Sequence, residues 1–174
     1  MKKLFVVSIL VLVLFTPSFG QKLMDEIYVG MPKKEFKALI KTNKDKYVIK
    51  TGIVNLKISG NYDENNLIKS ISFNEGISLD TEAPSTMRKI NSIKQYLVDK
   101  GCKVIEENNR VDYAKNIMKM VMGNSFILER DSVLYGLNFI SDAKWYGNKP
   151  AHIFTIWLEV APINYKEYFR SFNK

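Results

Sequence analysis

Few residues in this 174-residue chain are suited to acid–base catalysis or metal binding, and they are scattered. The chain has one histidine, His152, and one cysteine, Cys102. His152 lies in an otherwise apolar stretch, which favours a hydrogen-bonded core or strand-edge histidine over a catalytic base. A zinc site needs three or four ligands, so these two residues do not predict one. With no second cysteine and no histidine close in sequence, Cys102 is expected to be a small buried thiol.

Pairs of neighbouring acids are the remaining candidates for carboxylate chemistry. They are Asp25-Glu26, Asp63-Glu64 and Glu106-Glu107. Neighbours in a strand point to opposite faces, so such a pair would not share a site there. The stretch from Asp63 to Asn66 lacks the spacing and glycine of a calcium loop and is expected to be a plain turn. No nucleophile-elbow, phosphate-loop or dinucleotide motif is present, so the sequence predicts no catalytic residue, no metal and no cofactor.

The first element that could position a binding surface spans residues 27–40. Gly30 suits a sharp turn, and Pro32 lies at or near the first helical position, where its missing N–H costs little. Three apolar residues follow at helical spacing and predict a buried stripe: Phe36, Leu39 and Ile40. The lysines between them fall mostly away from that stripe, as a solvated face or as an anion-facing one.

The same stretch carries a family resemblance. The string IYVGMPKKEF, residues 27–36, resembles the Ile-x-x-Gly-Met-Thr-x-x-Glu-Val opening of small envelope proteins of the SmpA/BamE type, and residues 62–73 resemble the hairpin that follows it. The matching positions are Ile27, Gly30, Met31 and Glu35, with Phe36 keeping the last position apolar. Pro32 replaces the usual capping Thr or Ser, and no lipobox cysteine is present. The resemblance implies the fold of the β-lactamase inhibitor protein, protein–protein contact in the cell envelope, and no catalytic residues.

Positive charge is concentrated in one segment. The formal charge of the chain is +8, and Lys33–Lys57 holds eight lysines against Glu35 and Asp45. Such asymmetry favours anionic partners, either an acidic face of another envelope or extracellular protein or an anionic surface polymer. With only four arginines in an exported chain, nucleic acid is not expected as a partner. The candidate contact residues on the first helix are Lys33, Lys37 and Lys41.

The first twenty residues have the pattern of a secretory signal peptide. Lys2 and Lys3 form a positive n-region, residues 4–15 are a twelve-residue apolar run with one serine, and 18–20 offer small residues at a cleavage site. The run is shorter than the about 20 apolar residues that a membrane span needs. We therefore expect a periplasmic or extracellular chain with no integral span after cleavage, with an uncleaved anchor as the alternative.

Hydrophobic periodicity predicts the remaining elements. Strands are expected over 47–50, 54–59, 67–73, 102–107, 125–130, 133–140 and 151–160. Lys69 breaks the alternation of its strand, which suggests an edge position. The last strand has apolar residues on both faces, which suggests a central or doubly covered strand.

Helices are expected from Ser85 or Thr86 to Gly101 and over 163–172, where Tyr165, Tyr168, Phe169 and Phe172 form an aromatic docking stripe. The stretch Asp112–Met122 fits a helix better than a strand, although Met118, Met120 and Met122 would share one strand face. Together these elements predict an α+β protein with helices packed on one face of an antiparallel sheet. Residues 21–174 form one domain, in which 27–76 and 84–160 have the order of tandem helix-plus-strands repeats.

The best anchor for a partner is Trp145-Tyr146, in the predicted loop 142–150. The alternative is that both rings fold back over the end of the sheet. The leading hypothesis is an exported, non-enzymatic binding module that contacts an envelope or extracellular macromolecule. Two alternatives stay open. One is a small hydrolase of wall polymer or polysaccharide, with carboxylates assembled from distant strands. The other is a carrier of an apolar ligand between sheet and helices.

Overall fold

The computed structural model describes residues 20–75, 83–108, 120–146 and 149–172. In these ranges seven antiparallel strands form one sheet, in the order β3-β4-β5-β9-β8-β7-β6. The strands are β3 (Val48–Lys50), β4 (Asn55–Tyr62), β5 (Ile68–Asn74), β6 (Lys103–Glu107), β7 (Val121–Arg130), β8 (Val133–Tyr146) and β9 (Lys149–Pro162). A two-stranded ribbon of β1 (Lys22–Met24) and β2 (Ile27–Tyr28) precedes them. The predicted α+β class with an antiparallel sheet is confirmed.

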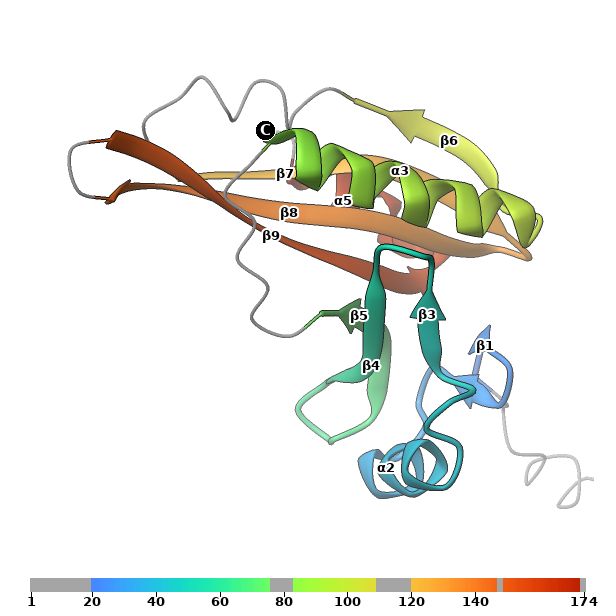
Figure 1. Cartoon of the computed structure of the whole chain (residues 1–174). Helices are drawn as coiled ribbons and strands as arrows, with labels where there is room; N and C mark the ends of the chain where they lie inside the picture. Colours follow the sequence, from blue (N-terminus) through green and yellow to red (C-terminus); the bar gives the residue numbers. More distant parts are fainter. Residues whose placement is uncertain (1–19, 76–82, 109–119, 147–148, 173–174) are drawn as a thin grey trace, which may run out of the picture.

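The sheet joins two meanders, each preceded by a helix. The first is α2 (Lys33–Thr42) followed by β3, β4 and β5, and the second is α3 (Ala83–Asp99) followed by β6 to β9. They meet where β5 pairs with β9, from Ile71↔Val160 to Asn74↔Trp157. Figure 1 shows β7, β8 and β9 running across the view, while β3, β4 and β5 run nearly at right angles to them. The order matches the predicted helix-plus-strands pattern, and the relation of the halves as repeats stays a prediction.

The main core lies between the sheet and the two long helices. Phe36 of α2 is buried in it, as are Ile90, Ile93 and Leu97 of α3, at the spacing the sequence predicts. Glycines in the left-handed region make the sharp turns at the helix ends, Gly30 with φ +88° and Gly101 with φ +86°. Within the described ranges, no helix combines the length and the apolar character needed to cross a membrane. Residues 1–19 of the predicted signal peptide lie outside these ranges.

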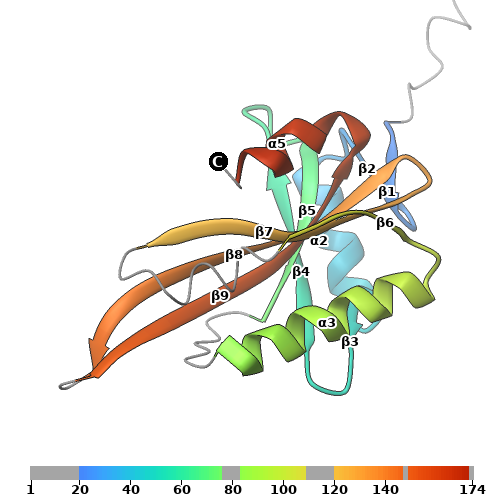
Figure 2. The same cartoon turned by 90° about the horizontal axis from the view of Figure 1, so that it is seen from above.

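A second, smaller core covers the opposite face of the sheet. A 3-10 turn, η1 (Ile163–Tyr165), leads into α5 (Lys166–Ser171), and Figure 2 shows α5 and α3 on opposite sides of the strands. The fully buried ring of Phe169 packs on Gly136 of β8, where a Cβ atom would lie 2.9 Å from the ring. β9 is the middle strand of the seven and is covered on both sides, as its apolar pattern predicts.

A β-bulge explains the position of Lys69. Tyr62 pairs with Ile68 and Asn61 pairs with Ser70, so Lys69 is an extra residue on β5. Ile68 precedes the bulge and Ile71 follows it, and both are buried in the main core. In a regular strand, residues three apart would point to opposite faces, and the extra residue restores the same face. β5 as a whole is not an edge strand, because it lies between β4 and β9, but its pairing with β9 begins only at Ile71, after Lys69.

Three other boundaries differ from the predictions. α3 begins at Ala83, before the expected caps Ser85 and Thr86. Pro84 is compatible with this start, because the N–H that a proline lacks has no helical partner in the first turn. Val121 and Met122 belong to β7 and alternate between buried and exposed, so the predicted helix does not extend through them. The rest of that prediction lies outside the described residues, except Met120, which is exposed.

The predicted loop 142–150 is mostly strand. β8 continues to Tyr146 and β9 begins at Lys149, with Trp145 opposite Pro150. Only residues 147–148, Gly-Asn in sequence, separate the strands, and such dipeptides are typical of tight hairpins. Pro150 is tolerated because it lies next to the first residue of its strand, where a missing N–H matters least. Strand pairing therefore runs to the end of the hairpin.

Candidate functional site

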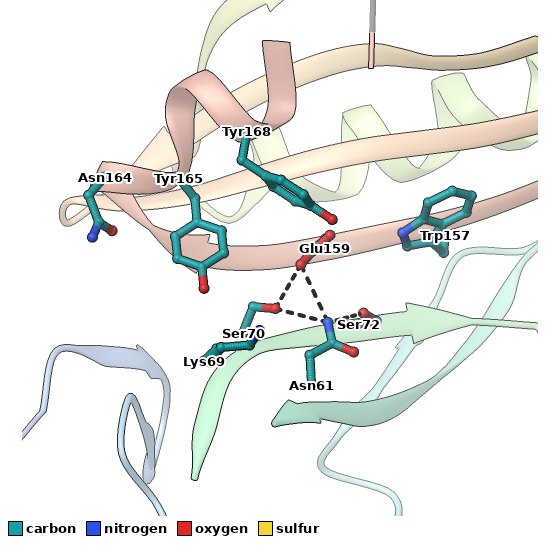
Figure 3. A pocket seen from close by; sticks show the side chains of 9 residues that line it. All are labelled: Asn61, Lys69, Ser70, Ser72, Trp157, Glu159, Asn164, Tyr165 and Tyr168. Carbon is teal, nitrogen blue, oxygen red and sulfur yellow. Dashed lines mark hydrogen bonds between the residues drawn. The ribbon is translucent and has the colours of Figure 1, made fainter. Parts of the chain in front are cut away.

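A group of buried and half-buried polar side chains lies on the face of the sheet that α5 covers in part. It lines an open pocket of about 570 Å³ at the seam between the two meanders. The lining residues are Asn61, Lys69, Ser70, Ser72, Trp157, Glu159, Asn164, Tyr165 and Tyr168. Figure 3 shows the carboxylate of Glu159 among the rings of Tyr165, Tyr168 and Trp157, with Asn61, Ser70 and Ser72 on the strands below.

Strand pairing builds the floor of this pocket. Ser72 of β5 lies opposite Glu159 of β9, and Ser70 lies opposite Asn61 of β4. Their side chains share the face that points away from the main core, because residues two apart on a strand point to the same side. The pairing thus brings together residues 61 and 159, which are far apart in sequence.

Hydrogen bonds fix one oxygen of the Glu159 carboxylate. The hydroxyl of Ser70 donates to Oε1 at 2.7 Å, and the side-chain amide of Asn61 donates to the same oxygen at 3.4 Å. That amide also donates to the hydroxyls of Ser70 (2.9 Å) and Ser72 (2.8 Å), so the floor is one connected network. Within the described residues, no hydrogen bond reaches Oε2. The network therefore orients the carboxylate and leaves its second oxygen for another donor.

The electrostatic environment of Glu159 is unfavourable for its charge. The residue is 5% exposed, and burial raises the pKa of its carboxyl above the ordinary value of 4.5. The bonds from Ser70 and Asn61 and the charge of Lys69 act in the opposite direction but are weaker than burial. No ion pair joins Glu159 to a cation within the described residues. A buried carboxylate without a paired cation is uncommon, because desolvation disfavours it.

Aromatic rings form the walls. Tyr165 and Tyr168 come from η1 and α5 and meet edge to face, with ring centres 5.7 Å apart. Trp157 comes from β9 and packs edge to face on Phe172 at 6.4 Å. Burial, and then the nearby Glu159, raise the pKa of both tyrosines, so both phenols stay protonated at neutral pH. The walls thus offer ring faces and hydroxyl groups, without a second negative charge.

Two contacts hold α5 in the place where its tyrosines reach the pocket. Phe169 inserts its ring over Gly136, as described above. Arg170 pairs with Glu106 of β6, and its Nε donates to Glu106 Oε1 at 2.6 Å. Arg170 also pairs with Glu167 at 2.7 Å. The wall of the pocket therefore depends on β6 and β8, which do not line it.

The other acids singled out in the sequence serve the fold. Glu26 accepts bonds from Lys46 and Tyr47, and Glu107 pairs with Lys94 at 2.7 Å. Asp63 Oδ1 accepts the backbone N–H groups of residues 65 and 67, which agrees with the interpretation of a plain turn. Cys102 is buried, as expected, and burial raises the pKa of its thiol. His152 lies in β9, and the structure does not describe its side chain.

The structure does not bring the predicted binding residues together. Trp145 and Tyr146 lie at the end of the β8–β9 hairpin and not in a loop, and the placement of their side chains is not described. Figure 1 shows that end of the hairpin extending away from β4, β5 and α2. Lys33 lies with its ammonium 4.9 Å from the ring centre of Tyr62, while Lys37 and Lys41 are exposed. Lys33 and Lys37 line a shallow hollow beside the 65–67 turn, separate from the Glu159 pocket.

Sequence reasoning missed the pocket. The predicted aromatic stripe docks the terminal helix through Phe169, and Tyr165 packs against the same core. The sequence did not indicate that Tyr165 and Tyr168 also line a pocket. One signal was present: Glu159 interrupts a strand predicted to be covered on both faces, and a charged residue at such a position calls for an explanation.

Comparisons with protein-family models, with curated proteins and with solved structures find no match to this chain. The resemblance of residues 27–36 to SmpA/BamE-type proteins therefore stays a prediction. The residues that carry it are structural, since Ile27 and Met31 are buried and Gly30 makes the turn into α2.

Proposed function

We propose that this protein is an exported, non-enzymatic binding module, and that the Glu159 pocket receives a chemical group of an envelope or extracellular macromolecule. The observation that carries the proposal is the carboxylate of Glu159, which is buried, oriented by a network on one oxygen, and open to the pocket on the other. Aromatic walls around a small number of fixed polar groups are typical of ligand sites. The pocket is also large enough for a side chain or a sugar ring.

Binding accounts for these groups better than bond cleavage does. Glycoside hydrolysis uses two carboxylates that flank the reacting bond, whereas Glu159 is the only acid among the residues that line the pocket. The two tyrosines remain protonated, and the remaining groups are amides, hydroxyls and Lys69. Among the described residues that line the pocket there is thus no base with a complementary acid, which favours the binding hypothesis over the hydrolase alternative.

The carrier alternative has a weaker structural basis. A hollow of about 250 Å³ lies between α3 and the sheet beside Cys102. Its lining includes Lys46, Lys100 and Arg130 as well as apolar side chains. It is less than half the volume of the Glu159 pocket, and its cationic lining does not suit a wholly apolar ligand.

The proposal can be tested by nuclear magnetic resonance with a defined fragment set that includes amines, sugars, carboxylates and alcohols. Trp157 is one of two tryptophans, so a Trp145→Phe background leaves its indole N–H as a single reporter. We expect at least one chemical class to shift that signal. Glu159→Gln should abolish the shift, whereas Glu64→Gln, the same charge change on an exposed turn residue, should not. If no class shifts the Trp157 signal, or if Glu159→Gln responds like the wild type, the proposal fails.

The exposed lysines of α2 support contact with an anionic partner surface. Within the described residues, no ion pair neutralises Lys37 or Lys41. We propose that they add non-specific affinity for an acidic surface. Lys37→Glu with Lys41→Glu should reduce cosedimentation with vesicles of anionic lipid at low salt. Lys100→Glu with Lys103→Glu serves as the control, because it changes the net charge equally near the end of α3. If both double variants lose vesicle binding equally, the loss reflects the net charge of the chain and not the position of the lysines on α2.

A further inference from the structure

Resting on the proposed function, we propose that the group bound in the Glu159 pocket is an alkylammonium, the positively charged end of an amine on an aliphatic stem. The first argument is that no residue in the described ranges supplies a counter-ion to Glu159. Glu159 is buried, and the hydrogen bonds that it accepts from described residues all go to Oε1. No cation among the described residues forms an ion pair with this carboxylate. An ammonium group would supply that charge, and its N–H groups can donate to Oε2.

The second argument is the composition of the walls. Rings attract cations through their faces, most strongly tryptophan and then tyrosine, and the attraction grows when the cation is desolvated. Trp157, Tyr165 and Tyr168 surround the carboxylate on three sides in Figure 3. Phe172 packs edge to face against two of these rings. Its ring centre lies 6.4 Å from that of Trp157 and 5.0 Å from that of Tyr168. One buried carboxylate within a group of rings is a combination that recognises an organic cation on an apolar stem.

Other ligand classes fit the same groups less well. An anion would meet the Glu159 charge, with only the exposed Lys69 to attract it. Calcium and magnesium ions prefer six or more oxygen ligands, and zinc prefers three or four ligands from His, Cys or carboxylates, whereas the described lining of this pocket has one carboxylate and no His or Cys. A neutral sugar could stack on the rings, but it would leave the buried charge without a counter-ion. Of these ligand classes, an ammonium group can both pair with the Glu159 carboxylate and interact favourably with the aromatic rings.

Lys69 provides a test of the sign of the ligand charge. Its own ammonium lies on the pocket lining and attracts the Glu159 carboxylate without forming an ion pair. A cationic ligand competes with it, so Lys69→Gln should strengthen binding. An anionic or zwitterionic ligand would use Lys69, so the same substitution should weaken binding. The direction of this single change thus separates the classes.

The experiment is a set of titrations of the full chain, in the Trp145→Phe background, followed by Trp157 fluorescence. The probes are N-acetyl-lysine amide, n-butylammonium and tetramethylammonium, with n-butanol, acetate and N-acetylglucosamine as comparisons. We expect saturable binding of N-acetyl-lysine amide and n-butylammonium, weaker binding of tetramethylammonium, which has no N–H group to donate to Oε2, and no binding of n-butanol or acetate. A preference for N-acetyl-lysine amide over n-butylammonium would indicate a lysine side chain of a protein, and the reverse would indicate a free amine.

The variants then test the site. Glu159→Gln should weaken ammonium binding about tenfold or more, because a hydrogen bond to a charged group is lost. Lys69→Gln should strengthen it about two- to threefold, as expected for an exposed charge. Tyr168→Leu gives a second, exposed position at which the ring alone is removed. Thermal unfolding of each variant shows whether it is folded.

The outcomes separate the inference from the proposed function. Saturable binding of N-acetylglucosamine that depends on Glu159, without ammonium binding, would overturn the inference and leave the proposed function in place. Ammonium binding that is unchanged in Glu159→Gln and Tyr168→Leu would also overturn the inference. Absence of every probe and every fragment from the pocket would overturn both.

Discussion

Two glutamates of this protein, Glu26 and Glu159, lie in opposite electrostatic environments. Glu26 lies beside β2 with a half-exposed side chain, accepts both 2.9 Å bonds from the Lys46 ammonium, and accepts a bond from the buried Tyr47 hydroxyl. The Tyr47 and Lys46 bonds lower the pKa of Glu26. Glu159 is buried, forms no ion pair with any described cation, and has a raised pKa. The charge of Glu26 is used within the chain, whereas that of Glu159 is available to a ligand.

The comparison shows why residue type alone does not mark a site. Glu26 belongs to one of the acidic pairs that stand out in the sequence, and it ties the β1–β2 ribbon to the start of β3. Glu159 stands alone in an apolar strand. What separates them is how many of their acceptor positions the chain fills, and in the case of Glu159 that depends on strand pairing.

The largest expected effect comes from removing the support of the pocket wall. Phe169→Ala deletes a fully buried ring and should lower the free energy of unfolding by about 3–5 kcal/mol, measured by urea denaturation. Binding of a probe at Trp157 should be lost with it, because η1 and α5 carry Tyr165 and Tyr168. The Glu26 corner lies elsewhere in the fold and should keep its contacts in the protein that remains folded. A loss of stability without a loss of binding would break the link between α5 and the pocket.

Gly136→Ala tests the same contact from the sheet. The new methyl group would lie 2.9 Å from the Phe169 ring, so the ring must shift. Overpacking of this kind should reduce stability by about 1–3 kcal/mol, again measured in urea. An alanine that proves neutral would show that α5 tolerates displacement.

Glu159→Gln should stabilise the protein at neutral pH. Since the pKa of Glu159 in the folded protein lies above 4.5, the folded state binds this proton more tightly than the unfolded state does. Ionisation therefore lowers stability as the pH rises through 4.5 to the folded-state pKa, and the penalty is complete above it. An amide removes the penalty. A gain of about 1 kcal/mol would raise Tm by about 2–4 °C.

The gain should disappear below about pH 4, where the acid is protonated in both states. Glu64→Gln, at an exposed turn residue, is the matched control for the removal of one negative charge. If Glu159→Gln lowers Tm at neutral pH, the charge of Glu159 is satisfied within the fold, and the comparison with Glu26 fails.

Glu26→Gln should have the smallest effect and the opposite sign. The folded-state pKa of Glu26 lies below 4.5, so its ionised form contributes stability that is present above pH 4.5 and is lost as the pH falls through the folded-state pKa. The variant should therefore lower Tm at neutral pH and match the wild type in acid. The difference in Tm between variant and wild type should therefore become more positive with rising pH for Glu159→Gln and more negative for Glu26→Gln.

Local sequence patterns predicted most of the elements. Alternation located β4, β7, β8 and β9, and the i, i+3, i+4 spacing located α2 and the docking face of α3, because both depend on residues close in sequence. The bulge at Lys69 was missed, since an extra residue in one strand is defined only by its partner strand. The end of the hairpin was predicted as a loop, whereas β8 and β9 continue into it, and a proline near the start of a strand is tolerated.

The site was out of reach for a different reason. Ser70 and Glu159 are 89 positions apart and meet only because β5 pairs with β9. No local periodicity reports such a pairing. Similarly, an aromatic stripe predicts that a helix docks on the sheet. It does not show which rings are fully buried, as Phe169 is, and which also line a pocket, as Tyr165 and Tyr168 do.

The pairing of β5 with β9 also has a mechanical consequence. In the described residues it is the hydrogen-bonded ladder that joins the first meander to the second, and it runs over four residue pairs. The pocket spans this ladder, with Asn61 and Ser70 on one side and Glu159 and Trp157 on the other. Tension between the halves would load these few bonds first. A molecule held by both sides would bridge the joint, so occupancy should raise the force at which the halves separate.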